Sequence, residues 1–177
     1  MRAKPRLLLL DAGAVIAAFQ CRGWAALCAA YDIVVPSIIV AEAHFYPDAD
    51  GRRQPIDLAS LVASNTIQEY EAPLAEFART AALLHPELRD RVHAGEQEAL
   101  TYLRTEPTDG VAFLSADGGA IEAAVALGVG DCAMSLEAAL QKCGQTKRLP
   151  ERHTEGFVRR KVQEGSIRLV QGRSVAP

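Results

Sequence analysis

Four carboxylates in this chain each stand beside a hydrophobic segment, and together they could form a metal site. They are Asp11, Glu42, Glu96 and Asp117. Asp11 and Asp117 lie where a buried strand is expected to give way to a helix, and the carboxyl ends of parallel strands face the ligand crevice of an open α/β sheet. Acids that converge there would repel one another unless a cation is present. Because Mg²⁺ and Mn²⁺ prefer oxygen ligands, the pattern predicts a divalent-metal site that handles phosphates.

The segments around these acids predict alternating strands and helices. Apolar runs predict strands at 7–10, 33–35 and 111–114, and helical patterns follow at 14–30, from Pro36 through Glu42 to Phe45, at 96–103 and at 120–127. A near-continuous apolar run is typical of a strand that is buried on both faces. Regular alternation of strand and helix predicts an α/β fold, in which a central, mostly parallel sheet lies between helices in three α/β/α layers.

The rest of the chain adds shorter elements. We expect a polar surface loop at 47–54, helices at 56–63, after Pro73 and at 135–142, and strands at 66–70 and 132–134. The last residues predict a helix at 152–163 and an extended segment at 167–170. We therefore divide the chain into one domain over residues 1–145 and a C-terminal tail, 146–177, that packs on it.

Composition limits the classes of protein to consider. A length of 177 residues with 49% hydrophobic residues fits one domain with a sizeable core. The net charge of −3 argues mildly against a nucleic-acid binder, although basic residues gather near the C-terminus, at Lys147, Arg148, Arg152, His153, Arg159, Arg160 and Lys161. A solvated helix face would explain that cluster equally well.

Three further features indicate the cell compartment. No apolar run approaches the roughly 20 residues that a membrane span needs, so we expect no membrane contact. Basic residues precede the first leucines as in a signal peptide, but Asp11 cuts the apolar run short. The four cysteines form no C-x-x-C pair, and we expect them to be reduced. These features predict a cytoplasmic protein.

Four motifs in order resemble those of the PIN domain, the metal-dependent nuclease fold found in the toxins of bacterial toxin–antitoxin modules. The motifs are Leu10-Asp11-Ala12-Gly13, Val35-Pro36-Ser37 with Glu42, Gly95-Glu96-Gln97-Glu98-Ala99, and Leu114-Ser115-Ala116-Asp117. The third resembles a variant found in some solitary PIN proteins. The resemblance covers about residues 6–143 and implies a PIN-like α/β/α fold.

The same resemblance implies a function and a site. It implies an endoribonuclease that needs Mg²⁺ or Mn²⁺, with RNA as substrate, an antitoxin protein as partner and a homodimer as the assembly. Asp11, Glu42, Glu96 and Asp117 would be the catalytic, metal-binding acids, with Ser37 and Ser115 in support. Glu98 is the alternative third acid, because residues two apart on a helix point in different directions and only one can face the site.

Other interpretations of these residues stay open. Asp11 and Asp117 could simply cap helices. Gly13 stands where many PIN domains carry a hydroxyl, and no further acid closely follows Asp117, so a catalytically degenerate PIN-like interaction module is the alternative function. A third interpretation is an unrelated protein with a doubly wound α/β fold. A dinucleotide site is disfavoured because no G-x-G-x-x-G follows the first strand, and a haloacid-dehalogenase-type enzyme because Gly13 replaces its second Asp.

Overall fold

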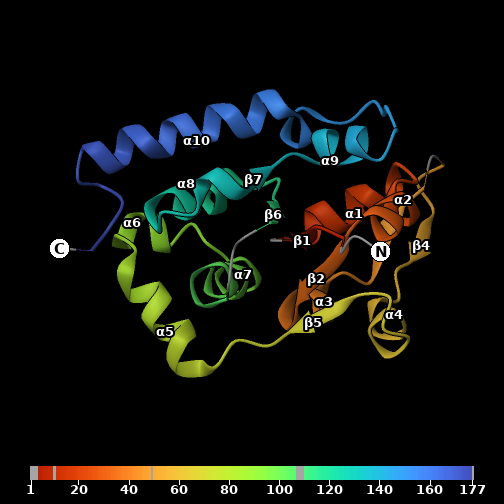
Figure 1. The fold of residues 1–177 in the computed structure, drawn as a ribbon, viewed down its shortest axis with the longest axis horizontal. Helices are drawn as coiled ribbons and strands as arrows, with labels where there is room; N and C mark the ends of the chain where they lie inside the picture. The colour runs from red at the N-terminus through yellow and green to blue at the C-terminus, as the bar shows by residue number, and fades with distance from the viewer. Residues whose placement is uncertain (1–3, 10, 49, 107–109, 177) are drawn as a thin grey trace.

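A parallel five-stranded sheet forms the centre of the computed structural model, which describes residues 4–9, 11–48, 50–106 and 110–176 (Figure 1). The strands run in the order β5 (Gln68–Tyr70), β2 (Asp32–Pro36), β1 (Arg6–Leu9), β6 (Val111–Leu114) and β7 (Ala133–Met134). In the central register Leu7 lies opposite Ile33 on one side and Ala112 on the other. The predicted α/β class with a parallel sheet is confirmed. Leu10, the expected end of the first strand, lies outside the described residues.

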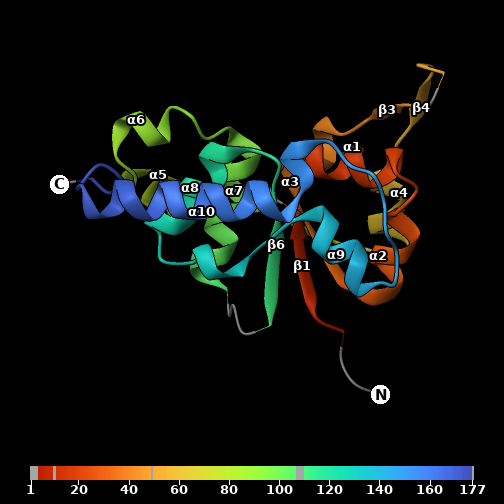
Figure 2. The ribbon, with the colours of Figure 1, turned by 90° about the horizontal axis from the view of Figure 1, so that it is seen from above.

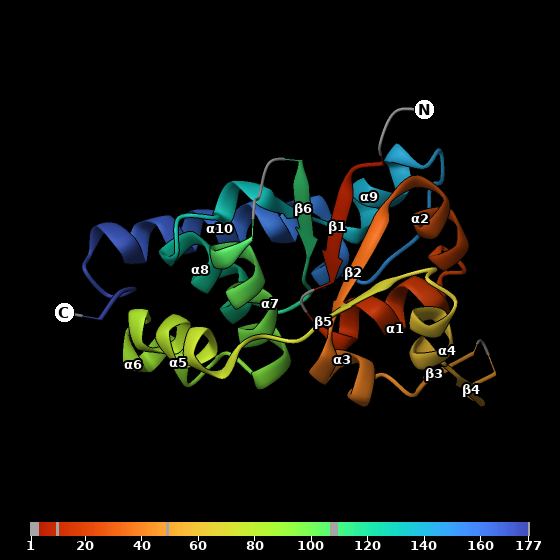
Figure 3. The same cartoon turned by 60° about the horizontal axis from the view of Figure 1, so that its bottom comes forward.

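Helices cover both faces of this sheet (Figure 3). They are α1 (Ala12–Gln20), α2 (Trp24–Ala30), α3 (Ser37–Glu42), α4 (Leu58–Ala63), α5 (Leu74–Leu83), α6 (Pro86–Arg89), α7 (Ala94–Thr105), α8 (Gly118–Ala126), α9 (Leu136–Lys142) and α10 (Glu155–Val170), with short 3₁₀ turns at Gly130–Cys132 and Glu151–His153. Among the described residues no single helix is long and apolar enough to cross a membrane; α1 and α2 reach that length and composition only as a pair bent by 109°.

The strand side chains divide the interior into two cores. Ile33 and Val35 pack with α1, α2 and α9 in one core, whereas Val34 packs with α7 and α8 in the other. Successive side chains of a strand point to opposite faces, so an unbroken apolar strand supplies both cores. This is the physical reason that continuous apolar runs, rather than alternating ones, predicted the central strands correctly.

The strand order places a topological switch point between β1 and β6. From β1 the chain crosses to β2 on one side, whereas from β6 it crosses to β7 on the other. Helices α1 and α8 therefore leave two neighbouring strands on opposite sides of the sheet, and their N-termini meet at its carboxyl edge. Open α/β sheets bind ligands at this crevice.

The predicted single helix over 14–30 is wrong, because the chain turns sharply between α1 and α2. Arg22 adopts a positive φ of 56°, which helices do not tolerate. Gly23 lies so close to α9 that a Cβ at this position would stand 2.6 Å from Leu140 Cδ2. The turn at Arg22 and the close approach at Gly23 allow α2 to pack against both β2 and α9.

The expected loop at 47–54 is part of an antiparallel hairpin that projects from the body of the protein (Figure 2). Its strands are β3 (Phe45–Pro47) and β4 (Arg53–Pro55), so Phe45 belongs to a strand and not to the preceding helix. Asp48 organises the turn by accepting hydrogen bonds from the backbone N–H groups of Asp50 and Arg52, at 3.0 and 2.9 Å.

The C-terminal residues form one long helix, so the predicted extended segment at 167–170 is wrong. Helix α10 runs along α8 (Figure 1) and makes its most extensive packing with that helix. Gly165 permits the close approach, because a Cβ there would lie 3.0 Å from Val125 Cβ and 3.2 Å from Glu122 Cα. A polar sequence with modest amphipathicity thus remains helical because a neighbouring helix supports it.

Candidate functional site

Asp11 joins the ends of the two central strands. It is the N-cap of α1, where its Oδ1 accepts a hydrogen bond from Ala14 N at 2.7 Å. Its Oδ2 accepts two more, from Ser115 Oγ and Ala116 N, each at 2.7 Å. Both carboxylate oxygens are therefore held by donors from two elements, and the side chain has a fixed orientation at the switch point.

Asp117 occupies the equivalent position at the end of β6. It is the N-cap of α8, and its Oδ1 accepts from Ala120 N at 3.0 Å. Its own N–H donates to Ser115 Oγ at 3.0 Å, so this one hydroxyl contacts both aspartates. The capping interpretation of both acids is correct. It does not conflict with a site, since capping fixes these carboxylates at adjacent strand ends.

Glu96 is the buried member of the group, with its residue only 4% exposed. It lies in the first turn of α7 and forms a capping box with His93, whose N–H donates to Glu96 Oε2 at 2.8 Å. Burial, assisted by the negative charges of Asp117 and Asp11, raises the pKa of Glu96 to about 7, while the His93 hydrogen bond opposes the rise. Glu96, in the first turn of α7, is therefore close enough to the two capping aspartates for their charges to influence its titration.

Glu98, the alternative third acid, has a different environment although it is equally buried. Its carboxylate accepts hydrogen bonds from Ser37 Oγ at 2.9 and 3.1 Å, from Ile38 N at 3.0 Å and from Ala72 N at 3.0 Å. It joins α7 to the start of α3 and to the chain before α5. The resemblance implied that Ser37 supports the metal site, but its hydroxyl donates to Glu98.

Glu42 differs from the other three predicted acids in its exposure to solvent. It follows the apolar residues Ile38, Ile39 and Val40 in the sequence, but it is exposed at the last position of α3. No hydrogen bond or ion pair links it to the other three acids within the described residues. Helix α3 is short, and its buried residue is Ile39.

The donor set at the switch point fits a hard divalent cation in kind. Three carboxylates supply oxygen ligands, and Mg²⁺ usually takes only one or two of them directly and keeps several waters. A cation would also relieve the repulsion that contributes to the raised pKa of Glu96. Within the described residues, however, no three His, Cys, Asp or Glu side chains are close enough to enclose a metal ion without water or rearrangement.

His153 is a residue of this region that sequence reasoning did not single out as a neighbour of Asp11. It is 2% exposed, and its Nε2 accepts a hydrogen bond from Arg152 Nε at 3.3 Å. Burial lowers the pKa of His153 and the Arg152 charge lowers it further, whereas the charge of Asp11 raises it. The sequence contained a basic C-terminal segment, but only the fold brings His153 within the influence of the Asp11 charge.

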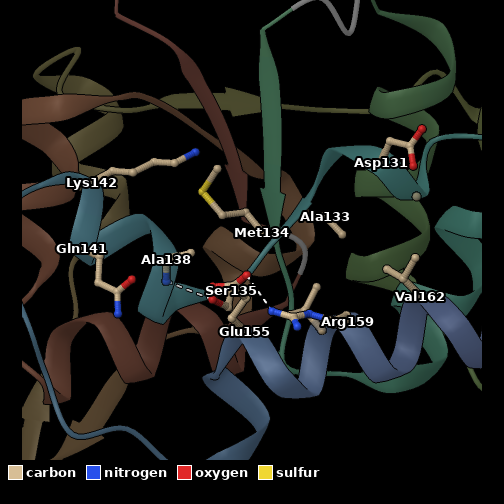
Figure 4. Close-up of a pocket in the computed structure, with 12 residues that line it drawn as sticks. Asp131, Ala133, Met134, Ser135, Ala138, Gln141, Lys142, Glu155, Arg159 and Val162 are labelled. Atoms are coloured by element: carbon tan, nitrogen blue, oxygen red, sulfur yellow. Dashed lines mark hydrogen bonds and ion pairs between the residues drawn. The ribbon is translucent and has the colours of Figure 1, made fainter.

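A separate cavity of about 700 Å³ lies between β7, α9 and α10 (Figure 4). Apolar side chains such as Met134 and Val162 line it together with Lys142 and with the ion pair between Arg159 and Glu155, whose atoms are 3.1 Å apart. None of the acids at the switch point lines this cavity. This cavity is therefore separate from the acids at the switch point.

Comparison with protein-family models, with curated proteins and with solved structures finds no match to this chain.

Proposed function

We propose that this protein is a metal-dependent endoribonuclease of the PIN-like type. The observation that carries the proposal is that Ser115 links Asp11 and Asp117 at adjacent strand ends, at the switch point of a parallel sheet, while the buried Glu96 senses both of their charges. Mutually repelling carboxylates at a ligand crevice are costly unless a cation binds them. Perturbed titration of such a group favours a functional site over a purely structural one.

In this proposal Asp117 and Glu96 bind Mg²⁺ or Mn²⁺ together with Asp11. A bound divalent ion would supply a water of lowered pKa and would polarise the phosphate oxygens. Ser115 Oγ and Ala116 N hold the Asp11 carboxylate in one orientation, which limits the reorganisation needed on binding. Glu96 exchanges its proton near neutral pH, so it must release that proton before it can act as a ligand.

The order of the four motifs supports RNA as the substrate and, by resemblance, an antitoxin protein and a homodimer as further parts of the proposal. Glu42 stays a predicted member of the site by resemblance alone, because it is exposed in this structure. Glu98 is not part of the proposed site, since its carboxylate is held by Ser37, Ile38 and Ala72.

A catalytically degenerate, protein-binding module is the second candidate. Both oxygens of Asp11 are already hydrogen-bonded, and the described residues contain no closed group of metal ligands. Gly118 and Gly119 follow Asp117, where many PIN domains carry a further acid. These observations favour a fold that keeps its capping acids without using them in catalysis.

The deciding experiment is cleavage of a labelled mixed RNA pool with Mn²⁺, with EDTA and with the variant Asp117→Asn. Asparagine is an equally good N-cap, so this substitution removes the charge while α8 keeps its cap. Asp131→Asn, an exposed acid away from the switch point, is the matched control.

We expect cleavage by the wild type and by Asp131→Asn with Mn²⁺, and none with EDTA or with Asp117→Asn. Cleavage that survives in Asp117→Asn would refute the assignment of the site. If the folded wild type neither cleaves RNA nor gains thermal stability with Mn²⁺, the degenerate interaction module is the better description.

A further inference from the structure

A second charged cluster, made of Arg91, Glu122, Lys161, Glu164 and Arg168, lies beside the Asp117 loop. These residues line a cavity of about 380 Å³ between the end of α6, helix α8 and helix α10. The Glu122 side chain is only 4% exposed and forms the anionic centre of the cluster. Three cations and two acids leave one excess positive charge in a protein whose net charge is −3.

Glu122 holds the three cations in a fixed arrangement. Arg91 donates to it through both terminal guanidinium nitrogens, Nη1 and Nη2, at 2.9 and 3.2 Å. Lys161 Nζ is 3.5 Å from Glu122 Oε1 and Arg168 Nε is 3.6 Å from Oε2. Because Lys161 and Arg168 stand about two turns apart on α10, they lie on the same face of that helix.

The cluster retains capacity to bind an additional anion. Arg168 Nη1 is buried and finds no hydrogen-bond partner among the described residues. A buried donor without a partner costs free energy, so a rotation of the Arg168 side chain, which is 28% exposed, that brings Nη1 to a phosphate oxygen would be favourable. Lys161 also pairs with Glu164 at 2.5 Å, but Glu164 is 43% exposed and can turn away into solvent.

This cavity is adjacent to the carboxylate group. A Cβ on Gly118, the residue after Asp117, would lie 2.7 Å from Lys161 Cε and 3.3 Å from its Nζ. A Cβ on Gly119 would lie 3.0 Å from the carbonyl oxygen of Arg91. The two glycines stand where the resemblance led us to expect an acid after Asp117. Because they have no side chain, they leave space for Lys161 and Arg91 beside Asp117.

We propose that Arg91, Lys161 and Arg168 form a subsite for a backbone phosphate of single-stranded RNA beside Asp117. The inference rests on the proposed function for the identity of the ligand. The phosphate would take the place of Glu164 at Lys161 and would satisfy Arg168 Nη1. Such a contact positions the strand without reading its sequence, and it makes binding sensitive to salt.

The test is binding of a short fluorescein-labelled single-stranded RNA, measured by anisotropy in EDTA so that no cleavage occurs. Lys161→Gln and Arg168→Gln should each weaken binding about fivefold and lower the slope of log affinity against log salt by about 0.7. Arg159→Gln on the exposed side of α10 is the matched control and should change the affinity less than about twofold.

A second pair of variants predicts the opposite sign. Glu164→Gln removes the competing acid and should tighten binding about fivefold, whereas Glu155→Gln, also ion-paired on α10, should have little effect. Equal effects of Lys161→Gln and Arg159→Gln, no tightening in Glu164→Gln, or no RNA binding by the wild type would each overturn the subsite. Because the assay contains no metal, a subsite that binds RNA can be confirmed even if the nuclease proposal fails.

Discussion

Two glutamates one residue apart on α7 should respond in opposite ways to loss of their charge. Glu96 and Glu98 are both almost fully buried, with 4% and 3% of each residue exposed. The Glu96 carboxylate is buried within the influence of two negative charges, whereas the Glu98 carboxylate accepts hydrogen bonds from three donors. We therefore expect Glu96→Gln to stabilise the metal-free protein and Glu98→Gln to destabilise it.

The effect of Glu96 on the free energy of unfolding follows from its pKa, which rises from 4.5 to about 7 on folding. Each tenfold change in proton affinity corresponds to about 1.4 kcal/mol, so ionised Glu96 lowers the free energy of unfolding by about 3 kcal/mol. The folded state binds more protons than the unfolded state between pH 4.5 and 7, so wild-type stability falls as pH rises through this window and is level above it. The amide introduced by Glu96→Gln keeps an acceptor for the His93 N–H and removes the charge.

For Glu98 the cost comes from donors that lose an acceptor. A glutamine has one acceptor oxygen, so its NH₂ group would face at least one of the N–H or O–H donors of Ser37, Ile38 and Ala72. Loss of a charge-assisted hydrogen bond with an unsatisfied donor costs about 2 to 4 kcal/mol.

The assay is urea unfolding in EDTA, followed by circular dichroism, at about pH 8 and about pH 5. The gain of Glu96→Gln over the wild type should be largest at the higher pH and should fade at the lower one, while Glu98→Gln is less stable at the higher pH. Other titrating groups cancel in the difference between variant and wild type. A Glu96→Gln protein that is less stable than wild type at the higher pH, or equally stabilised at both, would refute the reasoning.

Two further predictions concern the cation and the C-terminal helix. Mn²⁺ affinity, measured by calorimetry, should increase as the pH rises through the Glu96 pKa of about 7, because the ion must displace a proton from that carboxyl group. An affinity that does not change with pH would remove Glu96 from the site. Gly165→Ala should lower the unfolding free energy by about 1 to 3 kcal/mol, since its Cβ would stand 3.0 to 3.2 Å from α8. The exposed Gly156→Ala, with only Thr154 Oγ1 at 4.0 Å, should instead stabilise by about 0.5 to 1 kcal/mol, and equal thermal melts of the two variants would contradict this account.

Sequence reasoning succeeded where the structure depends on residues that are close together in the chain. Strand ends next to capping acids are local features, so the positions of β1, β6, α1 and α8 and the meeting of Asp11 with Asp117 could be predicted from apolar runs and parallel topology. Helix geometry also predicted that Glu96 and Glu98 point in different directions, because positions two apart differ by more than half a turn. Their carboxylates do have different environments, and the choice of Glu96 as the site residue stays a prediction.

The sequence by itself thus determined the class of fold and the pair of strand-end aspartates, because apolar periodicity and helix capping act over a few residues. The exposure of Glu42, the break at Arg22 and the approach of His153 to Asp11 were decided only by tertiary packing. Each depends on contacts between elements far apart in the chain, which no local pattern encodes. The cationic cluster around Glu122 has the same origin, since Arg91 and α10 meet there only when α10 packs along α8.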